Sequence, residues 1–520
     1  MNKSFPIIDL FAGPGGLGEG FSAFSNYQKS RPFSIVLSIE KDFYAHKTLQ
    51  LRSFYRQFAP NEVPEDYYSY LRGDFDSSLI AERYPVEIGR AMNEAWRAEL
   101  GEVDPQIVDE RITKALNGNK KWVLIGGPPC QAYSLVGRSR TGGTNPYDAR
   151  LYLYREYLRI IAKHSPPVFI MENVKGLLSS RINNELIFDK ILSDLRRPCA
   201  AIKNSLEKGD FSAYDNEYNL FSLVNESSET ASGWKELHPR DFIIKSEDYG
   251  IPQARHRVII LGIRQDLSPS GAEVLTPSTP IDVKSVLSGL PSLRSGLSKT
   301  KDSSVAWINA IQSILSRKTV SCYKDDSGSE VSQKIQEIAS NLCAPEAGRG
   351  SDFIFTPAGQ LDHYSHWYLD HRMCGICNHS ARGHMVDDLH RYIFAACYAK
   401  VHERSPTLQF FPKELLPHHT NVEKAVFGSH FADRFRVQVE SKPSTTITSH
   451  IAKDGHYYIH PDPSQCRSLT VREAARLQTF PDNYFFEGPR TEQYKQVGNA
   501  VPPLLAKQIA KVVYDVLQAG

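Results

Sequence analysis

The chain has 520 residues, of which 41% are apolar and 23% are charged, a composition typical of a globular protein with roughly two to four domains. This composition excludes a disordered, collagen-like or coiled-coil chain. Lysine and arginine number 61 and aspartate and glutamate 59, so the net charge of +2 identifies no nucleic-acid or membrane partner. A local basic groove remains compatible with that balance.

No apolar run reaches the roughly 18 residues that a membrane helix requires. The N-terminal apolar run is interrupted by Asp9, unlike a signal peptide. The eight cysteines are spread over the chain, which is not typical of a disulfide scaffold. We therefore expect a soluble protein of a reducing compartment, without a membrane partner, in which a cysteine is available for chemistry.

Five short apolar runs alternate with helical patterns in the first half of the chain. They are rich in valine, isoleucine and leucine and lack strict alternation, which is typical of strands buried on both faces of a parallel sheet. They cover residues 6–10, 35–39, 122–125, 168–171 and 258–263. Helices are predicted between them, for example at residues 151–163. The pattern predicts an α/β, doubly wound domain over residues 1–264.

The segment 265–450 differs in composition. It is rich in serine, proline, glycine and histidine and shows no alternation of strands and helices. We expect a second, smaller domain there, followed by a helical segment, residues 451–520, that returns to the first domain. Two stretches of the first domain, 76–120 and 195–242, carry no readable role.

A glycine-rich turn follows the first predicted strand. Its glycines let a ligand approach the backbone closely, and the helix that follows offers free N–H groups. Glu40 ends the second predicted strand, where a carboxylate can accept hydrogen bonds from ribose hydroxyls. Gly13, Gly15 and Gly18 also fit the pattern G-x-G-x-x-G of dinucleotide-binding proteins. The loop therefore indicates an adenosine-type cofactor without deciding which one, and a purely structural turn is the alternative.

Two motifs with reactive side chains come directly after predicted strands. Cys130 belongs to Gly-Pro-Pro-Cys-Gln, and the prolines fix the direction of its thiol at the carboxyl edge of the sheet. Such a cysteine can be a nucleophile, although a buried structural cysteine is the commoner case. Glu172, in Glu-Asn-Val, should face the same edge and exchange a proton there. The alternative interpretation is that Glu172 only lies at the N-terminus of a helix, where glutamate is frequent.

A pair of arginines precedes the last of the five predicted strands. Arg255 and Arg257, in Gln-Ala-Arg-His-Arg, should project to one face because side chains alternate along a strand. Two guanidinium groups suit a carbonyl, carboxylate or phosphate. The alternative is a pair of surface arginines.

Six motifs, taken in order, resemble the bacterial restriction–modification type of DNA (cytosine-5-)-methyltransferase. They are the glycine loop, Pro-Pro-Cys-Gln, Glu-Asn-Val, Gln-x-Arg-x-Arg, Arg-Glu-Ala-Ala-Arg-Leu-Gln and Gly-Asn-Ala-Val-Pro. The resemblance covers roughly residues 5–263 and 440–516. It implies a Rossmann-like, doubly wound methyltransferase domain that uses S-adenosylmethionine, with a target-recognition domain at 265–450.

The resemblance also implies partners and a location. The substrate would be a specific double-stranded DNA sequence, and a cognate restriction endonuclease would act separately. The enzyme would work as a monomer on DNA in the bacterial cytoplasm. An RNA-modifying relative and a DNA-binding protein without catalysis remain alternatives. A nicotinamide-dependent oxidoreductase is a third, but it leaves Cys130 and Glu172 unexplained.

Roles for single residues follow from the same resemblance. Cys130 would attack carbon 6 of a cytosine flipped out of the duplex, and Glu172 would give a proton to the base. Arg255 and Arg257 would support both. In the cofactor pocket, Glu40 would bind the ribose and Asp74 the adenine amino group. The full set of expected cofactor contacts is Phe11, Gly13, Gly15, Glu40, Asp74, Pro129, Leu151, Asn499 and Ala500.

A short cluster in the second domain invites a metal hypothesis. Cys374, Cys377, His379 and His384 fit half of a zinc site, which needs four ligands. The further candidates are His371, His390 and Cys397. A polar, histidine-rich loop without metal is the alternative, and no other metal site is expected.

Overall fold

A computed structural model describes residues 4–129, 149–182, 185–203, 216–225, 229–230, 233–234, 237–267, 273–357, 359–417 and 433–519. Cys130 lies outside these residues, and so does the side chain of Leu151.

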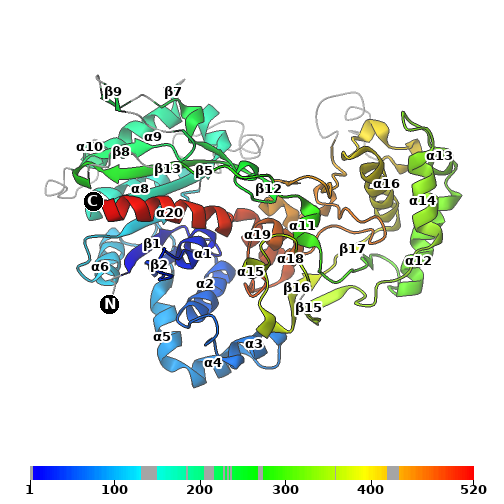
Figure 1. Ribbon diagram of the computed structural model, residues 1–520, viewed down its shortest axis with the longest axis horizontal. Helices are drawn as coiled ribbons and strands as arrows, with labels where there is room; N and C mark the ends of the chain where they lie inside the picture. Colours follow the sequence, from blue (N-terminus) through cyan, green and yellow to red (C-terminus); the bar gives the residue numbers. More distant parts are fainter. Residues whose placement is uncertain are drawn as a thin grey trace.

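An eight-stranded sheet forms the centre of the larger lobe (Figure 1), in the order β11-β13-β5-β4-β1-β2-β3 with β8 beside β13. Its strands are β1 (Phe5–Leu10), β2 (Phe33–Glu40), β3 (Ala95–Arg97), β4 (Val123–Gly126), β5 (Val168–Val174), β8 (Tyr218–Phe221), β11 (Ile243–Lys245) and β13 (His256–Arg264). The first five strands run parallel, whereas β13 is antiparallel to its neighbours β5, β8 and β11. All five predicted strands are confirmed.

Two details differ from the prediction. The run at 258–263 is not parallel, because a strand buried on both faces is apolar in either direction and its composition carries no information on direction. The three-residue strand β3 lies inside the stretch 76–120, where no strand is predicted, because it is too short to show a period.

Helices cover both faces of the sheet. On one face lie α6 (Pro105–Leu116), α8 (Ala149–His164), α9 (Ile187–Arg196) and α10 (Pro198–Lys203), which share a buried apolar core with the strands. On the other face lie α1 (Gly16–Ala23) and α20 (Pro503–Ala519), packed on each other although they come from opposite ends of the chain. The doubly wound architecture is therefore confirmed, and α8 confirms the helix predicted at 151–163.

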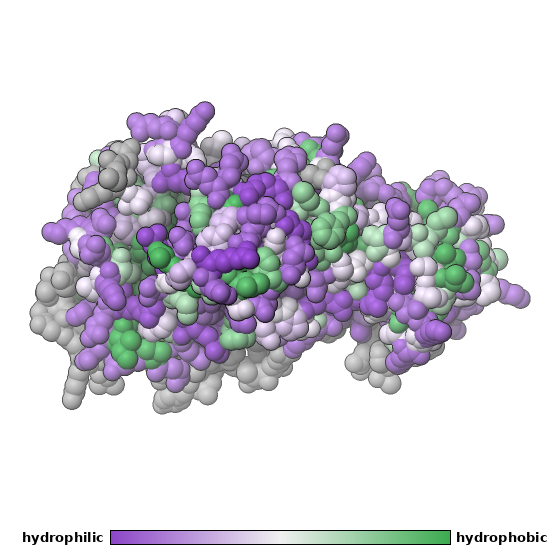
Figure 2. Space-filling model, turned by 90° about the horizontal axis from the view of Figure 1, so that it is seen from below, coloured by the Kyte–Doolittle hydropathy of each residue, from purple (hydrophilic) through white to green (hydrophobic). Residues whose placement is uncertain are grey.

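The stretch between β2 and β3 is helical. It consists of α2 (Phe43–Arg56), α3 (Glu65–Arg72), α4 (Ser77–Arg83) and α5 (Pro85–Glu94), seen at the bottom of the larger lobe in Figure 1. Seen from below, the molecule is mostly hydrophilic, and its apolar areas are small and separate (Figure 2). None of the helices in the described part of the chain combines the length and apolar character of a membrane span.

A second, helical lobe has a core of its own. Its helices are α12 (Ser304–Gln312), α13 (Lys318–Ser321), α14 (Glu330–Ser340) and α16 (Val386–His402), and Trp307, Ile335 and Phe394 are among its fully buried residues. In Figure 1 this lobe stands to the right of the sheet, and the elements of the C-terminal part lie between the two. The core of this lobe also contains Ile459 and Cys466, so it is not confined to residues 265–450.

The region between the lobes mixes segments from distant parts of the sequence. Here α18 (Val471–Leu477) and α19 (Arg490–Asn499) share a core with α11 (Val283–Leu287), α15 (Ser365–Tyr368) and the turn η10 (Ser449–Ala452). The boundaries at residues 264 and 450 stay a prediction. The small strand pairs are β6–β7 (Arg181–Ile182, Glu185–Leu186), β9–β10 (Glu229–Thr230, Gly233–Trp234), β12–β18 (Gln253–Ala254, Ser444–Thr445), β14–β17 (Gly296–Leu297, Gly383–His384) and β15–β16 (Gly350–Phe355, Gly375–Ser380).

Candidate active site

The glycine loop joins β1 to α1 at the carboxyl edge of the parallel strands. Phe11, Gly13 and Gly15 have φ values of 55°, 57° and 93°, in the region that favours glycine. A Cβ atom at position 13 would meet nothing within 4 Å. This side of the loop is therefore open to a ligand, at the edge of the sheet where α/β proteins bind theirs.

Glu40 stands at the end of β2 and holds the glycine loop. Its carboxylate accepts the N–H of Gly13 at 2.8 Å and the N–H of Asp42 at 2.7 Å. Burial raises the pKa of Glu40, and these two N–H donors partly offset that rise. The predicted acceptor thus lies directly beside the loop that it should serve.

The C-terminal loop closes on the same place. A Cβ at Gly16 would lie 2.2 Å from the carbonyl oxygen of Val501 and 3.3 Å from the Cβ of Ala500. Only glycine at position 16 permits this approach. Ala500 is buried and Asn499 is exposed beside it. The structure therefore places Ala500 at the start of α1, and Asn499 precedes it in the chain.

Asp74 is not at the sheet edge where its predicted role requires it. It lies in an exposed turn after α3 and pairs with Arg72 at 3.2 Å. The preceding Gly73, with φ of 79°, ends that helix as a left-handed cap. The role expected for Asp74 comes from the family resemblance alone. In the structure the strand beside β2 is β3, and the acidic residue that follows it is Glu99, paired with Lys41 at 2.7 Å.

Glu172 and Arg257 meet at the edge of the sheet. Arg257 Nε donates to Glu172 Oε1 at 3.0 Å, and both side chains are 14% exposed. The contact exists because β5 and β13 are antiparallel neighbours there. Burial lowers the pKa of Arg257, and the charge of Glu172 opposes that shift. A Cβ at Gly127 would lie 2.8 Å from Glu172 Oε2, so the carboxylate lies over the last described residues before Cys130.

The start of the Cys130 loop is held by a residue that sequence reasoning did not single out. Asn173 Nδ2 donates to the carbonyl oxygen of Pro128 at 3.1 Å. Pro129, which follows, is half-buried. The signal was present in the motif Glu-Asn-Val, whose second residue directly follows the predicted acid.

Arg255 serves the C-terminal loops. It is buried and donates to Ile447 O at 2.7 Å and to Gly498 O at 3.3 Å. Burial lowers its pKa, and Arg257 lowers it further. Arg257 therefore lies beside the predicted acid Glu172, whereas Arg255 fixes the end of α19.

Two glutamines complete this link. Gln253 Nε2 donates to Gln478 Oε1 at 3.0 Å, and Gln478 Nε2 donates to Val497 O at 2.7 Å. The motifs Gln-x-Arg-x-Arg and Arg-Leu-Gln are therefore in contact in space. The sequence pattern shows both glutamines but not that one binds the other.

The four zinc candidates do not form a ligand cluster. No group of three or more His, Cys, Asp or Glu side chains suited to a metal occurs among the described residues. Each buried candidate has a partner at or next to the start of α18: Cys377 accepts from Arg472 at 2.9 Å, His379 pairs with Thr470 at 2.9 Å, and His384 lies 3.4 Å from the Ser468 hydroxyl. Cys374 is exposed. The half-site hypothesis is wrong for this set, because these side chains form the polar contact between β16, β17 and α18.

His379 should make stability depend on pH. Its Nε2 donates to Pro291 O at 2.9 Å, because a carbonyl only accepts. In the neutral ring, Nδ1 then accepts from the Thr470 hydroxyl at 2.9 Å. Burial lowers the pKa of His379 to about 4, whereas an unfolded histidine takes a proton near pH 6.5. The stability that the neutral His379 contributes is therefore lost as the pH falls from about 6.5 toward about 4. The loss amounts to up to about 1.4 kcal/mol per pH unit.

Urea unfolding at pH 7 and pH 5 tests this expectation. The free energy of unfolding should fall more steeply with acid in the wild type than in His379→Gln, which has no proton to gain. Equal slopes in the two proteins would contradict the neutral, buried ring.

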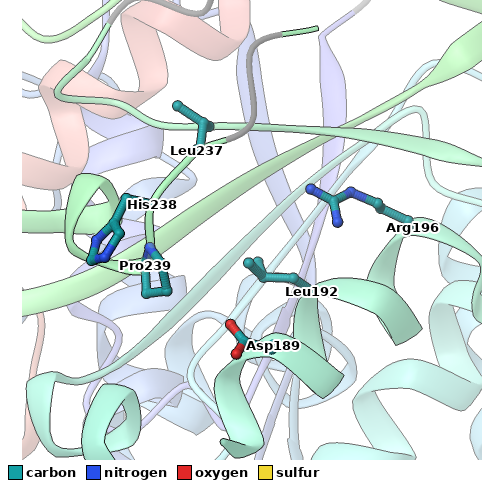
Figure 3. Close-up of a pocket in the computed structure, with 6 residues that line it drawn as sticks. All are labelled: Asp189, Leu192, Arg196, Leu237, His238 and Pro239. Atoms are coloured by element: carbon teal, nitrogen blue, oxygen red, sulfur yellow. The ribbon is translucent and has the colours of Figure 1, made fainter. Parts of the chain in front are cut away.

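A cavity of about 420 Å³ lies between α9 and the segment before η3 (Pro239–Phe242). Figure 3 shows Asp189, Leu192 and Arg196 on the helix side and Leu237, His238 and Pro239 opposite. None of the described residues that are predicted for the active site lines it. It is therefore separate from the edge that carries Glu40 and Glu172.

Comparison with known proteins decides the family. The model of the family described as C-5 cytosine-specific DNA methylase matches residues 83–197 and 241–515. The chain belongs to this family. As a cytosine-5 DNA methylase it methylates cytosine in DNA and uses a methyl donor, and the predicted family, fold class and reaction are confirmed. The nicotinamide-dependent alternative is wrong.

Relatives of this methylase are type II methyltransferases. M.Bpa9945I of Bacillus paralicheniformis is 32% identical over 532 residues, covering 98% of this chain and 99% of the relative. M.DdeI of Desulfomicrobium norvegicum is 25% identical over 515 residues, covering 97% of this chain and 87% of the relative. A prophage-encoded Escherichia coli protein, assigned as a DNA modification methyltransferase, has a similar fold, with a TM-score of 0.51 at 18% identity over 99% of this chain and 100% of that one. The methylase is thus of the restriction–modification type.

Proposed function

We propose that the methylase transfers a methyl group from S-adenosylmethionine to carbon 5 of a cytosine flipped out of a specific duplex sequence, with Cys130 as the nucleophile. The observation that carries this proposal is the pair formed by Glu172 and Arg257, next to the residues that lead to Cys130. The glycine loop, closed by the C-terminal loop, lies at the same edge of the sheet.

The residues at this edge fit S-adenosylmethionine. Gly13 leaves open space beside the loop, and Glu40 offers a carboxylate to ribose hydroxyls. When bound, this donor supplies an electrophilic methyl group on a sulfonium. Phe11, Gly15, Pro129, Leu151, Asn499 and Ala500 would complete the pocket. Glu99, at the end of β3, takes the place of Asp74 as the acceptor for the adenine amino group.

Cys130 makes carbon 5 nucleophilic. Its thiolate adds to carbon 6, forming a C–S bond and moving the ring's electron pair to carbon 5. Glu172 gives a proton or hydrogen bond to the ring nitrogen, so that negative charge does not accumulate there. Carbon 5 then takes the methyl group and loses its proton to a base; the electron pair left behind re-forms the double bond between carbons 5 and 6, and the C–S bond at carbon 6 breaks to release the cysteine thiolate. Extruding the base from the duplex costs a few kcal/mol, supplied by protein–DNA contacts.

Two arginines keep this arrangement in place. Arg257 orients Glu172 through their hydrogen bond, and Arg255 fixes the carbonyl of Gly498 next to Asn499. The helical lobe and the residues around it would read the target sequence through a few side chains at base edges. We expect one chain per DNA site, in the bacterial cytoplasm, with a separate cognate endonuclease.

Bisulfite sequencing tests the proposal. A methylation-free bacterial host should express the chain, beside a second host that expresses Cys130→Ser. We expect methylcytosine at one short motif in the first host and none in the second. Folded protein that binds S-adenosylmethionine and leaves DNA unmethylated would contradict the proposal and favour an RNA substrate or a DNA-binding role without catalysis.

A further inference from the structure

A tyrosine from the C-terminal part of the chain contacts the glycine loop. The hydroxyl of Tyr484, a fully buried residue, donates to the carbonyl oxygen of Pro14. On the other side of the same peptide group, the N–H of Gly15 donates to Ala12 O at 2.9 Å. The Pro14–Gly15 peptide is therefore held from both sides, and only one of these two bonds is local.

The lack of a side chain at Gly15 leaves room for this contact. A Cβ there would lie 3.0 Å from the Tyr484 oxygen and 2.8 Å from Leu49 Cδ2. Gly15 is also the N-cap of α1, with φ of 93°. The tyrosine thus occupies the space that a side chain at the turn of the loop would take.

A buried ion pair connects α1 to the same part of the chain as Tyr484. Arg52 of α2 donates to both carboxylate oxygens of Glu19 on α1, at 2.9 and 2.5 Å, and to Asn483 Oδ1 at 3.0 Å. Its guanidinium lies 4.8 Å from the centre of the Tyr484 ring. Because Asn483 and Tyr484 are neighbours in the chain, the helix that follows the glycine loop is held by the same short segment.

This segment, residues 481–486, is anchored on its far side. Arg472 of α18 donates to Pro481 O at 2.9 Å and to Tyr484 O at 2.7 Å. Asn378 of β16 accepts from Phe486 N at 3.0 Å. These hydrogen bonds therefore fix the position of the Tyr484 hydroxyl beside the glycine loop.

We propose that Tyr484 is a positioning residue for the methyl-donor loop: it fixes the Pro14–Gly15 peptide and so the course of the loop's backbone beside the open side at Gly13. This inference rests on the proposed function, in which the glycine loop binds S-adenosylmethionine. Removing the hydroxyl leaves the Pro14 carbonyl without its partner, and the loop gains conformations that do not bind the donor.

Tyr484→Phe tests the proposal, with Tyr368→Phe as the matched control. Tyr368 is also fully buried, and its hydroxyl donates to Arg476 O at 2.8 Å, away from the loop. Calorimetry with S-adenosylhomocysteine should give a Kd about 10-fold higher for Tyr484→Phe and an unchanged Kd for Tyr368→Phe. The KM for the donor should rise in the same proportion, whereas the KM for DNA and kcat at saturating donor should stay nearly unchanged.

The possible results distinguish the positioning role of Tyr484 from the proposed function. Equal donor affinity in the two variants overturns the positioning role. A wild type that binds no S-adenosylhomocysteine overturns the proposed function instead. Should Tyr484→Phe not fold, Asn483→Ala loosens the same segment while keeping the hydroxyl. A donor affinity unchanged from wild type in that variant would likewise overturn the proposal.

Discussion

Replacement of Cys130 by serine should abolish methyl transfer while leaving donor binding intact. An alkoxide forms far less readily than a thiolate at neutral pH, so carbon 6 of the cytosine receives no nucleophile and carbon 5 stays unreactive. We expect a loss of more than about 1,000-fold in the single-turnover rate, since removing a catalytic nucleophile has effects of this order or larger.

Tritium transfer from labelled S-adenosylmethionine to a DNA carrying the identified motif measures this rate. Cys343→Ser is the matched control, because Cys343 is an exposed free cysteine of the helical lobe and the substitution is the same. The control should keep the wild-type rate. Residual activity of Cys130→Ser near that of the control would remove Cys130 from its proposed role.

Replacement of Glu172 by glutamine should lower the single-turnover rate by about 100-fold or more, the range for removal of a general acid. An amide still hydrogen-bonds to a ring nitrogen but has no acidic proton to give. The change also leaves Arg257 without its carboxylate, so the free energy of unfolding should fall by about 1–3 kcal/mol.

A control variant that breaks another ion pair distinguishes a loss of catalysis from a loss of stability. Asp109→Asn removes the carboxylate that Arg159 of α8 contacts at 2.9 Å, on the helical layer away from the sheet edge. It should destabilise the fold to a similar extent without slowing methyl transfer. If Glu172→Gln and Asp109→Asn show the same rate, Glu172 has no part in the reaction.

The sheet could be predicted from sequence because its strands are short runs of branched apolar residues. Ile7, Leu124 and Ile170 lie in such runs, and each is fully buried. Direction could not be predicted, since the hydrophobic pattern of β13 is the same whichever way the strand runs. The strand β3 could not be found because three residues carry no period.

The candidate site could be predicted where a motif and the end of a strand coincide. Glu40 and Glu172 satisfy both conditions and lie at the carboxyl edge of the sheet. Contacts between distant motifs could not be predicted, because Gln253 and Gln478, or Tyr484 and Pro14, have no local pattern that relates one to the other. The zinc hypothesis is wrong for the same reason. Cys377 and His379 form hydrogen bonds with residues at the start of α18, and no local pattern predicts these contacts.

The packing of α20 on α1 has a consequence for how the enzyme is made. The face of the sheet that includes Ile7 is covered only in part, by α1, on the nascent chain until residues 503–519 leave the ribosome. At bacterial or eukaryotic synthesis rates that delay is on the order of a minute. Chaperones that shield apolar surface should therefore engage the N-terminal part during translation, and a prematurely terminated chain should be degraded before it occupies DNA.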